Sequence, residues 1–118
     1  MPIRNALASI AVKDLAAAAG WYQRILGRPA DSLPMAEIAE WKFERGGWLQ
    51  LYQLPERAGA GSVTLAVTDI EEQADHLQRC GIDVGQRTSG TKVKTIMITD
   101  PDGNHIAFAE AMDRNMAQ

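Results

Sequence analysis

Apolar and polar residues follow two similar patterns along this chain, one in each half. Residues 10–15 read Ile-Ala-Val-Lys-Asp-Leu, and residues 65–70 read Leu-Ala-Val-Thr-Asp-Ile. Each pattern is followed by apolar residues at helical spacing and then by a glycine, Gly27 or Gly81. A unit of about half this length is too small to bury a good core alone, so we expect the two copies to pack together.

The alternation of apolar and polar positions predicts the element order βαβββ in each copy. Asp14 and Asp69 are suited to cap the two helices, because aspartate accepts hydrogen bonds from free N–H groups of a first turn. The strands of the first copy are expected at residues 4–12, 37–44 and 47–54. The strands of the second copy are expected at residues 62–68, 82–86, 91–99 and 104–110. We therefore predict a single α+β domain with module one at 4–55, a linker at 55–61, module two at 62–111 and a fraying polar tail from Met112.

Composition limits the possible partners. The chain has 118 residues and a net charge of −3, and this balance argues against nucleic acid, whose phosphates require a basic face. No apolar run approaches the ~20 residues of a membrane span, and the start Met-Pro-Ile-Arg-Asn lacks the apolar core of a signal peptide. The single cysteine, Cys80, cannot form an internal disulfide, so we expect a cytoplasmic protein.

Short motifs stand at matching places in the two copies. In the first copy they are Val12-x-Asp14-Leu15, Trp21-Tyr22 and Leu26-Gly27. In the second copy they are Val67-x-Asp69-Ile70, Gly81 and the turn Asp100-Pro101-Asp102-Gly103-Asn104. Over about residues 5–110, this ordered set resembles the vicinal oxygen chelate superfamily, which contains glyoxalase I, bleomycin-resistance proteins and extradiol dioxygenases. The resemblance implies two βαβββ modules paired edge to edge, a curved mixed sheet around a cleft, and a homodimer.

The period of the strands predicts which side chains face the cleft, because successive residues of a strand point to opposite faces. Leu49 and Leu51 are assigned to the helix-side core, and so is Trp41. The predicted ligand-binding residues are Leu7, Ser9, Trp48, Gln50, Tyr52, Ser62, Thr64, Thr95, Met97, His105 and Ala107. Aromatic faces bind planar or apolar molecules, and the polar side chains could orient polar groups. Alternatively, Trp48 and Tyr52 fill the interior or contact a second subunit.

The resemblance also implies four metal-ligand positions. Leu7 and Ser62 stand where metal-dependent members have histidine, and Gln50 and Ala107 stand at the acidic positions. Leucine and alanine cannot bind a metal, and serine and glutamine are poor ligands for a transition ion. We therefore expect no metal or other cofactor, which argues against glyoxalase, epimerase and dioxygenase activity.

Few other residues suggest chemistry. His76 is expected to face solvent, and His105 is either a hydrogen-bonding or stacking group of the cleft or a satisfied structural histidine. The acidic pairs Glu71-Glu72 and Glu37/Glu40 are interpreted as solvated faces or helix caps. The turn before Asn104 is expected only to shape a hairpin, braced by the Asn104 amide. No nucleophile elbow or phosphate-binding loop is present.

These observations favour a metal-free member of the superfamily that binds a small apolar or aromatic molecule in the cleft. The alternative is a glyoxalase- or isomerase-like enzyme that uses a relocated metal or His105 as a general acid/base. A third possibility is that the cleft is filled and that the protein acts through a dimer face.

Overall fold

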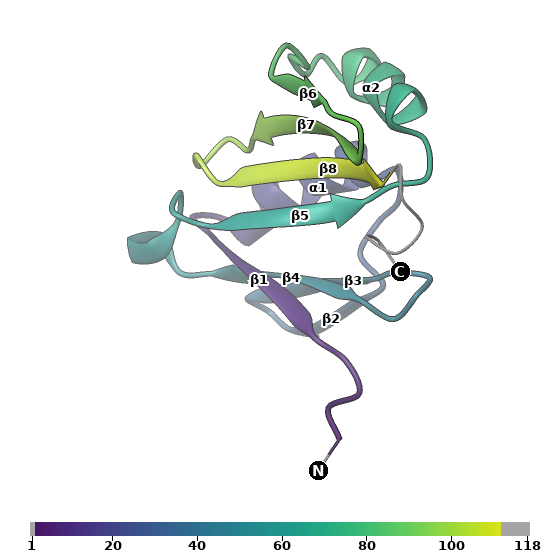
Figure 1. Ribbon diagram of the computed structural model, residues 1–118. Coiled ribbons are helices and arrows are strands. Elements are labelled where there is room, and N and C mark those ends of the chain that lie inside the picture. The colour runs from purple at the N-terminus through teal and green to yellow at the C-terminus, as the bar shows by residue number, and fades with distance from the viewer. Residues whose placement is uncertain (1, 112–118) are drawn as a thin grey trace. The chain divides into compact units, whose positions relative to one another are not determined.

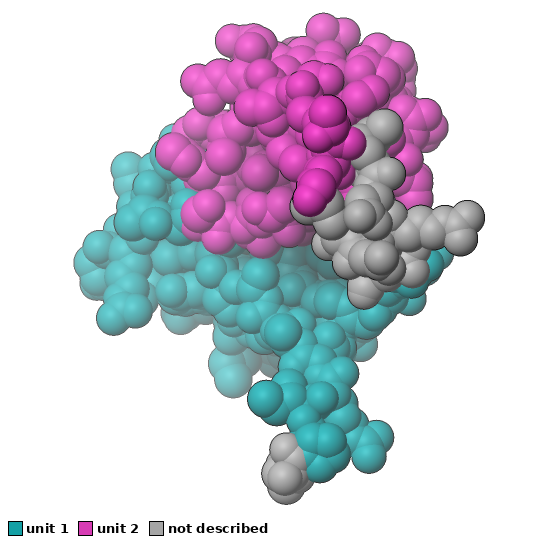
Figure 2. All heavy atoms as spheres, in the orientation of Figure 1, with its two compact units in different colours: residues 1–61, 101–104 teal, residues 62–100, 105–118 magenta. Residues whose placement is uncertain are grey.

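The computed structural model describes residues 2–111, which form two compact units with a four-stranded sheet and a helix in each (Figure 1). Among the described residues, the first unit comprises residues 2–61 and Pro101–Asn104, and the second comprises Ser62–Asp100 and residues 105–111 (Figure 2). The predicted α+β class with two βαβββ modules is confirmed. The predicted tail from Met112 lies outside the described residues. Within that part of the chain, neither helix has the length and apolar character needed to cross a membrane.

The first unit contains one mixed sheet. Its elements are β1 (Leu7–Val12), α1 (Leu15–Leu26), β2 (Ser32–Met35), β3 (Ile38–Lys42), β4 (Trp48–Gln53) and the short 3-10 helix η1 (Pro55–Arg57). The strand order is β1-β4-β3-β2, in which β1 and β4 are parallel and the other pairs are antiparallel. The apolar face of α1 and the alternate positions of β1, β3 and β4 form the core.

The ends of α1 follow the sequence signals. The Asp14 carboxylate accepts a hydrogen bond from the Ala17 N–H, as predicted for a helix cap. Gly27 ends the helix with φ +82°, a conformation that glycine adopts without strain. Trp41 of β3 is fully buried beneath the helix, and its ring centroid lies 6.3 Å from that of Tyr22. Trp41 is therefore helix-side core, as predicted.

The predicted order βαβββ requires four strands in the first copy, but the sequence placed only three of them and did not locate β2. Ser32–Met35 contains Pro34, which lacks an N–H group, and three of its four residues are exposed, so no alternation marks it as a strand. It pairs only with β3, through an irregular register between Ser32 and Met35. β2 is therefore the edge strand that completes the first module, and an edge strand tolerates a proline because one of its sides is unpaired.

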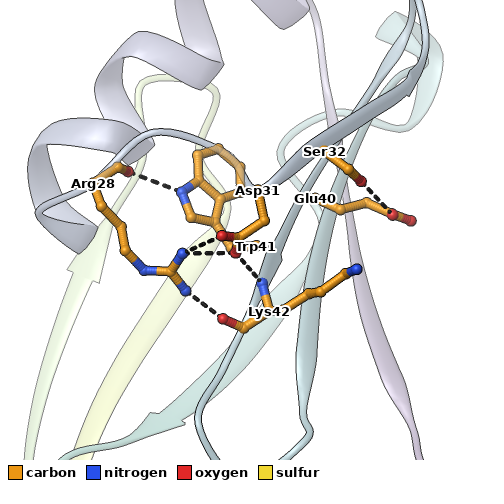
Figure 3. A network of polar contacts seen from close by, with 6 residues as sticks. All are labelled: Arg28, Asp31, Ser32, Glu40, Trp41 and Lys42. Atoms are coloured by element: carbon orange, nitrogen blue, oxygen red, sulfur yellow. Dashed lines mark hydrogen bonds and ion pairs between the residues drawn. The ribbon is translucent and has the colours of Figure 1, made fainter.

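A polar network precedes β2 and fixes its approach to β3 (Figure 3). The Arg28 guanidinium donates to both Asp31 carboxylate oxygens, at 2.7 and 2.6 Å, and also to the Lys42 carbonyl. Asp31 in turn accepts a 2.7 Å hydrogen bond from the Lys42 N–H, and the Trp41 indole N–H donates to the Arg28 carbonyl at 3.0 Å. The hydrogen bond from Arg28, and next the one from Lys42, lower the pKa of the Asp31 carboxyl below its ordinary value of 3.8.

We expect Asp31→Asn to make the protein less stable at neutral pH but not under strongly acidic conditions. Because the pKa is lower in the folded state, Asp31 stabilises the fold above its unfolded value of 3.8, and this contribution is lost as pH falls through the folded pKa. Urea unfolding of both proteins across this range measures the difference. Asp75→Asn, at an exposed position of the second helix, controls for loss of a surface charge. A stability difference that stays constant down to the most acidic conditions would contradict the assignment.

The second unit repeats the arrangement of the first. Its elements are β5 (Ser62–Ala66), α2 (Ile70–Arg79), β6 (Arg87–Ser89), β7 (Val93–Thr99) and β8 (His105–Ala111). The strand order is β5-β8-β7-β6, with β5 and β8 parallel. Asp69 caps α2 by accepting from Glu71 and Glu72, as predicted. His76 was expected to face solvent, but it is half-buried and its Nε2 lies 3.8 Å from the Cys80 Sγ.

The predicted strand at 82–86 is wrong, and the strand of this region is β6. The Ile82 N–H donates to the Leu77 carbonyl and so prolongs the end of α2, while the Gly85 N–H donates to the Asp83 side chain. Val84 is buried, and an apolar residue is needed there for that reason. Its alternation with polar neighbours resembles the pattern of a strand. The alternation therefore reports contact with the core rather than sheet pairing.

The turn before β8 has a larger structural role than shaping a hairpin. The fully buried Asn104 accepts from the N–H groups of Gly59 and Gly61 at 3.0 and 2.8 Å, and donates to the Ala11 carbonyl at 2.9 Å. Gly59 has φ +99°, and a Cβ there would lie 2.5 Å from the Asp102 carbonyl oxygen. Asn104 therefore holds the segment after η1 against β1, within the first unit.

Candidate functional site

The two faces of the first sheet differ in burial and composition. Leu49 and Leu51 are fully buried on the side of α1, as predicted, whereas Trp48, Gln50 and Tyr52 alternate with them and are half-buried. We call this second side the open face of the first sheet. It carries Leu7, Ser9, Ala11, Ser32, Ile38, Glu40, Lys42, Trp48, Gln50 and Tyr52.

Four polar side chains are joined by hydrogen bonds across all four strands of the open face. The Ser9 hydroxyl donates to Gln50 Oε1 at 3.1 Å, and the Gln50 amide donates to Glu40 Oε2 at 3.0 Å. The Ser32 hydroxyl donates to Glu40 Oε1 at 3.1 Å, and Figure 3 shows this end of the series. We call Ser9, Gln50, Glu40 and Ser32 the polar ladder. It fixes the position of each side chain and leaves the carboxylate in the middle of the sheet.

The interpretation of Glu40 as a solvated surface acid is wrong, because only 9% of the residue is exposed. Figure 3 shows Trp41 and Glu40 pointing to opposite sides of β3. Glu40 is therefore a residue of the candidate site that sequence reasoning missed. A signal was present, since assigning Trp41 to the core places its neighbour Glu40 on the same face as Gln50.

An aromatic side chain lies on each side of the polar ladder. Trp48 is in register with Leu7 and Lys42, and the Lys42 ammonium lies 4.6 Å from the centroid of the Trp48 ring. Tyr52 is in register with Ala11 and Ile38. The open face therefore presents two aromatic groups separated by a carboxylate and an amide.

A pocket of about 380 Å³ adjoins the Tyr52 end of the open face. Ser9, Ala11 and Tyr52 line it from the sheet, and residues 56–58, 60 and 61 line it from the other side. Residues 55–61 were predicted only as a linker, but their first part is η1 and their side chains form a wall of this pocket. The pocket includes charged groups of both signs, from Glu56 and Arg57.

The predicted site residues of the second unit also share one face of their own sheet. Ser62, His105 and Thr99 are aligned in register, and Thr64, Ala107 and Met97 form the next row. The Thr95 hydroxyl lies 2.5 Å from that of Thr88. His105 is exposed. The residues named on this face thus have smaller side chains than those of the open face of the first sheet, and no carboxylate is among them.

Comparison of the two sheets identifies the positions that differ between the repeats. The pair Glu40 and Gln50 at the centre of β3 and β4 corresponds to the pair Met97 and Ala107 at the centre of β7 and β8. The two central groups of the polar ladder are therefore apolar in the second copy.

The donors at the four positions that the resemblance assigns to metal do not fit a metal ion. Leu7 and Ala107 have no donor atom, and both polar ends of the Gln50 amide are engaged within the polar ladder. Among residues 2–111, no group of three or more His, Cys, Asp or Glu side chains is arranged to hold a metal.

The chain matches the family model described as a glyoxalase-like domain over residues 8–109. A glyoxalase/bleomycin resistance protein from Catenulispora acidiphila is 32% identical, with a TM-score of 0.83 over 91% of this chain and 97% of that one. TnmS3, an antibiotic binding protein from Streptomyces, is 21% identical, with a TM-score of 0.79 over 93% and 97%. A lactoylglutathione lyase from Agrobacterium tumefaciens is 19% identical, with a TM-score of 0.76 over 93% and 95%. A search of curated protein sequences found no match.

Proposed function

Because this chain belongs to the family of glyoxalase-like domains, we propose that it binds a small organic molecule on the open face of the first sheet without using a metal. The observation that carries this proposal is the combination of Trp48 and Tyr52, both half-buried, with a hydrogen-bonded polar ladder between them. Aromatic faces supply affinity for a planar group, and fixed polar groups supply orientation. The pocket beside Tyr52 gives room for part of such a molecule.

One similar protein supports binding as the activity, because TnmS3 is named as an antibiotic binding protein. The protein from Catenulispora acidiphila is named as a glyoxalase/bleomycin resistance protein. A protein that only binds a molecule needs no catalytic metal. The absence of metal-ligating atoms at Leu7 and Ala107 is therefore compatible with a binding function. The alternative enzyme hypothesis would use a relocated metal or His105 as a general acid/base, and His105 is an exposed residue.

Native mass spectrometry of the purified 118-residue chain tests the metal-free part of the proposal. We expect no stoichiometric divalent ion after incubation with zinc or nickel. A stoichiometric ion that the chain retains would overturn the metal-free assignment.

We expect Trp48→Ala to weaken binding of benzamide, a neutral aromatic probe, by about tenfold, because it removes one of the two aromatic surfaces. The measurement is an NMR titration that follows the backbone amides of Gln50 and Tyr52. Leu33→Ala removes an exposed apolar side chain from the same sheet and should leave the affinity unchanged. Perturbation confined to residues outside the open face would contradict the proposed site.

A further inference from the structure

Glu40 is a buried carboxylate that has only neutral partners among the described residues. Its two oxygens accept hydrogen bonds from Ser32 and Gln50, and neither of these side chains is charged. Removing a carboxylate from water is costly unless charged or strong hydrogen-bond partners replace the water. A carboxylate also has about four acceptor sites, so two neutral donors leave it with unused capacity.

The nearest candidate cation on the same face is engaged elsewhere. Lys42 lies two residues along β3 from Glu40, and Figure 3 shows both side chains on the same side of the strand. The Lys42 ammonium is nevertheless placed over the Trp48 ring, 4.6 Å from its centroid. The open face thus already holds one cation on an aromatic ring, while its carboxylate is paired with neutral groups.

The fold itself does not require a carboxylate at this position. Met97 occupies the corresponding place in the second sheet, opposite Ala107, and that sheet has the same strand order. If the residue at position 40 served only to stabilise the fold, an apolar side chain would do so with a lower desolvation cost than a carboxylate. Glu40 therefore has a role specific to the first unit.

We propose that Glu40 determines the ligand specificity of the open face, and that the ligand presents to it a positively charged nitrogen with N–H donors, such as an amine or an amidine. This inference rests on the proposed function and names the chemical class of its ligand. Charge-assisted hydrogen bonds to a carboxylate are stronger than neutral ones, and aromatic faces such as that of Tyr52 also attract cations. Gln50 is a positioning residue, because its amide fixes the Glu40 carboxylate and is itself held by Ser9.

Three probes of equal size and different charge test the proposal on the full-length protein. Benzamidine is cationic, benzamide is neutral and benzoate is anionic, and an NMR titration of the Gln50 and Tyr52 amides gives the affinity of each. We expect benzamidine to bind about tenfold more tightly than benzamide, and benzoate to bind more weakly than either. Glu40→Gln should abolish the preference for benzamidine while retaining binding of benzamide. Glu37→Gln is a matched control, since it makes the same change at an exposed position three residues away.

The outcomes separate this inference from the function on which it rests. Equal affinities for benzamidine and benzamide in the wild-type protein would overturn the role of Glu40 but leave small-molecule binding intact. A preference that survives in Glu40→Gln would assign the charge selectivity to another group and would also overturn it. No perturbation of the open face by any of the three probes would overturn both proposals. The wild-type comparison needs no variant, so equal affinities for benzamidine and benzamide would overturn the role of Glu40 even where a substitution prevents folding.

Discussion

Replacing Trp41 with alanine should lower the free energy of unfolding by about 4 kcal/mol, the largest effect that we expect from a single substitution. The Trp41 side chain is fully buried between the sheet and α1, packs against the Tyr22 ring and donates its indole N–H to the Arg28 carbonyl. Alanine would leave a large cavity and would also remove the hydrogen bond that anchors the Arg28 backbone. The cavity and the lost hydrogen bond both destabilise the core between β3 and α1.

Urea unfolding followed by circular dichroism measures this effect, and Trp48→Ala is the matched control. Trp48 is the same residue type, one strand away, but it is only half-buried on the open face. We expect its removal to change the stability by less than about 1 kcal/mol, since little new cavity forms at an accessible site. Similar losses in the two variants would show that the open face is as tightly packed as the core, which would contradict a binding surface there.

The second large effect is expected for Asn104→Ala, at about 3 kcal/mol. The substitution leaves the N–H groups of Gly59 and Gly61 and the Ala11 carbonyl without the amide that satisfies them. The hydrogen bond to the Ala11 carbonyl is buried and those from Gly59 and Gly61 are part-buried. A backbone group that loses its partner away from water costs more than the net value of a hydrogen bond. The three groups lie on two separate segments, so the variant should also loosen the wall of the pocket formed by residues 56–61.

Asn5→Ala provides the comparison for Asn104. Asn5 also uses its amide to bind a backbone carbonyl, that of Gly46, but it is exposed. We expect its loss to cost no more than about 0.5 kcal/mol, as for most surface substitutions. Thermal unfolding of both variants measures the contrast, and hydrogen exchange at Gly59 and Gly61 locates it. Unchanged exchange at these two amides in Asn104→Ala would refute the proposed anchoring.

The repeat and the face assignments could be predicted because they depend on local patterns. The caps at Asp14 and Asp69 form with the expected partners, and Trp41 is buried as the alternation indicated. Strand β2 could not be predicted in this way, because an exposed edge strand that contains Pro34 has no apolar alternation. The opposite error occurred at 82–86, where Val84 is buried although this segment forms no strand.

The candidate site was harder to predict than the fold, because its character depends on neighbours across the sheet. A glutamate within a strand is interpreted as a surface residue unless its face is known, and so Glu40 was overlooked. The hydrogen bonds from Gln50 and Ser32 join residues that are 10 and 8 positions away from it. The role of Asn104 was similarly hidden, since its partners Gly59 and Ala11 are 45 and 93 positions away.

The anchoring of Asn104 in the first unit bears on how the duplicated chain can be divided. A fragment that ends at Gly61 contains every helix and strand of the first repeat but lacks Pro101–Asn104, which belongs to the same unit. Expressed alone, such a half would expose three backbone groups that the intact protein satisfies, and we expect it to need residues 101–104 added in trans or by fusion. The boundaries of the two sequence repeats therefore differ from those of the two compact units.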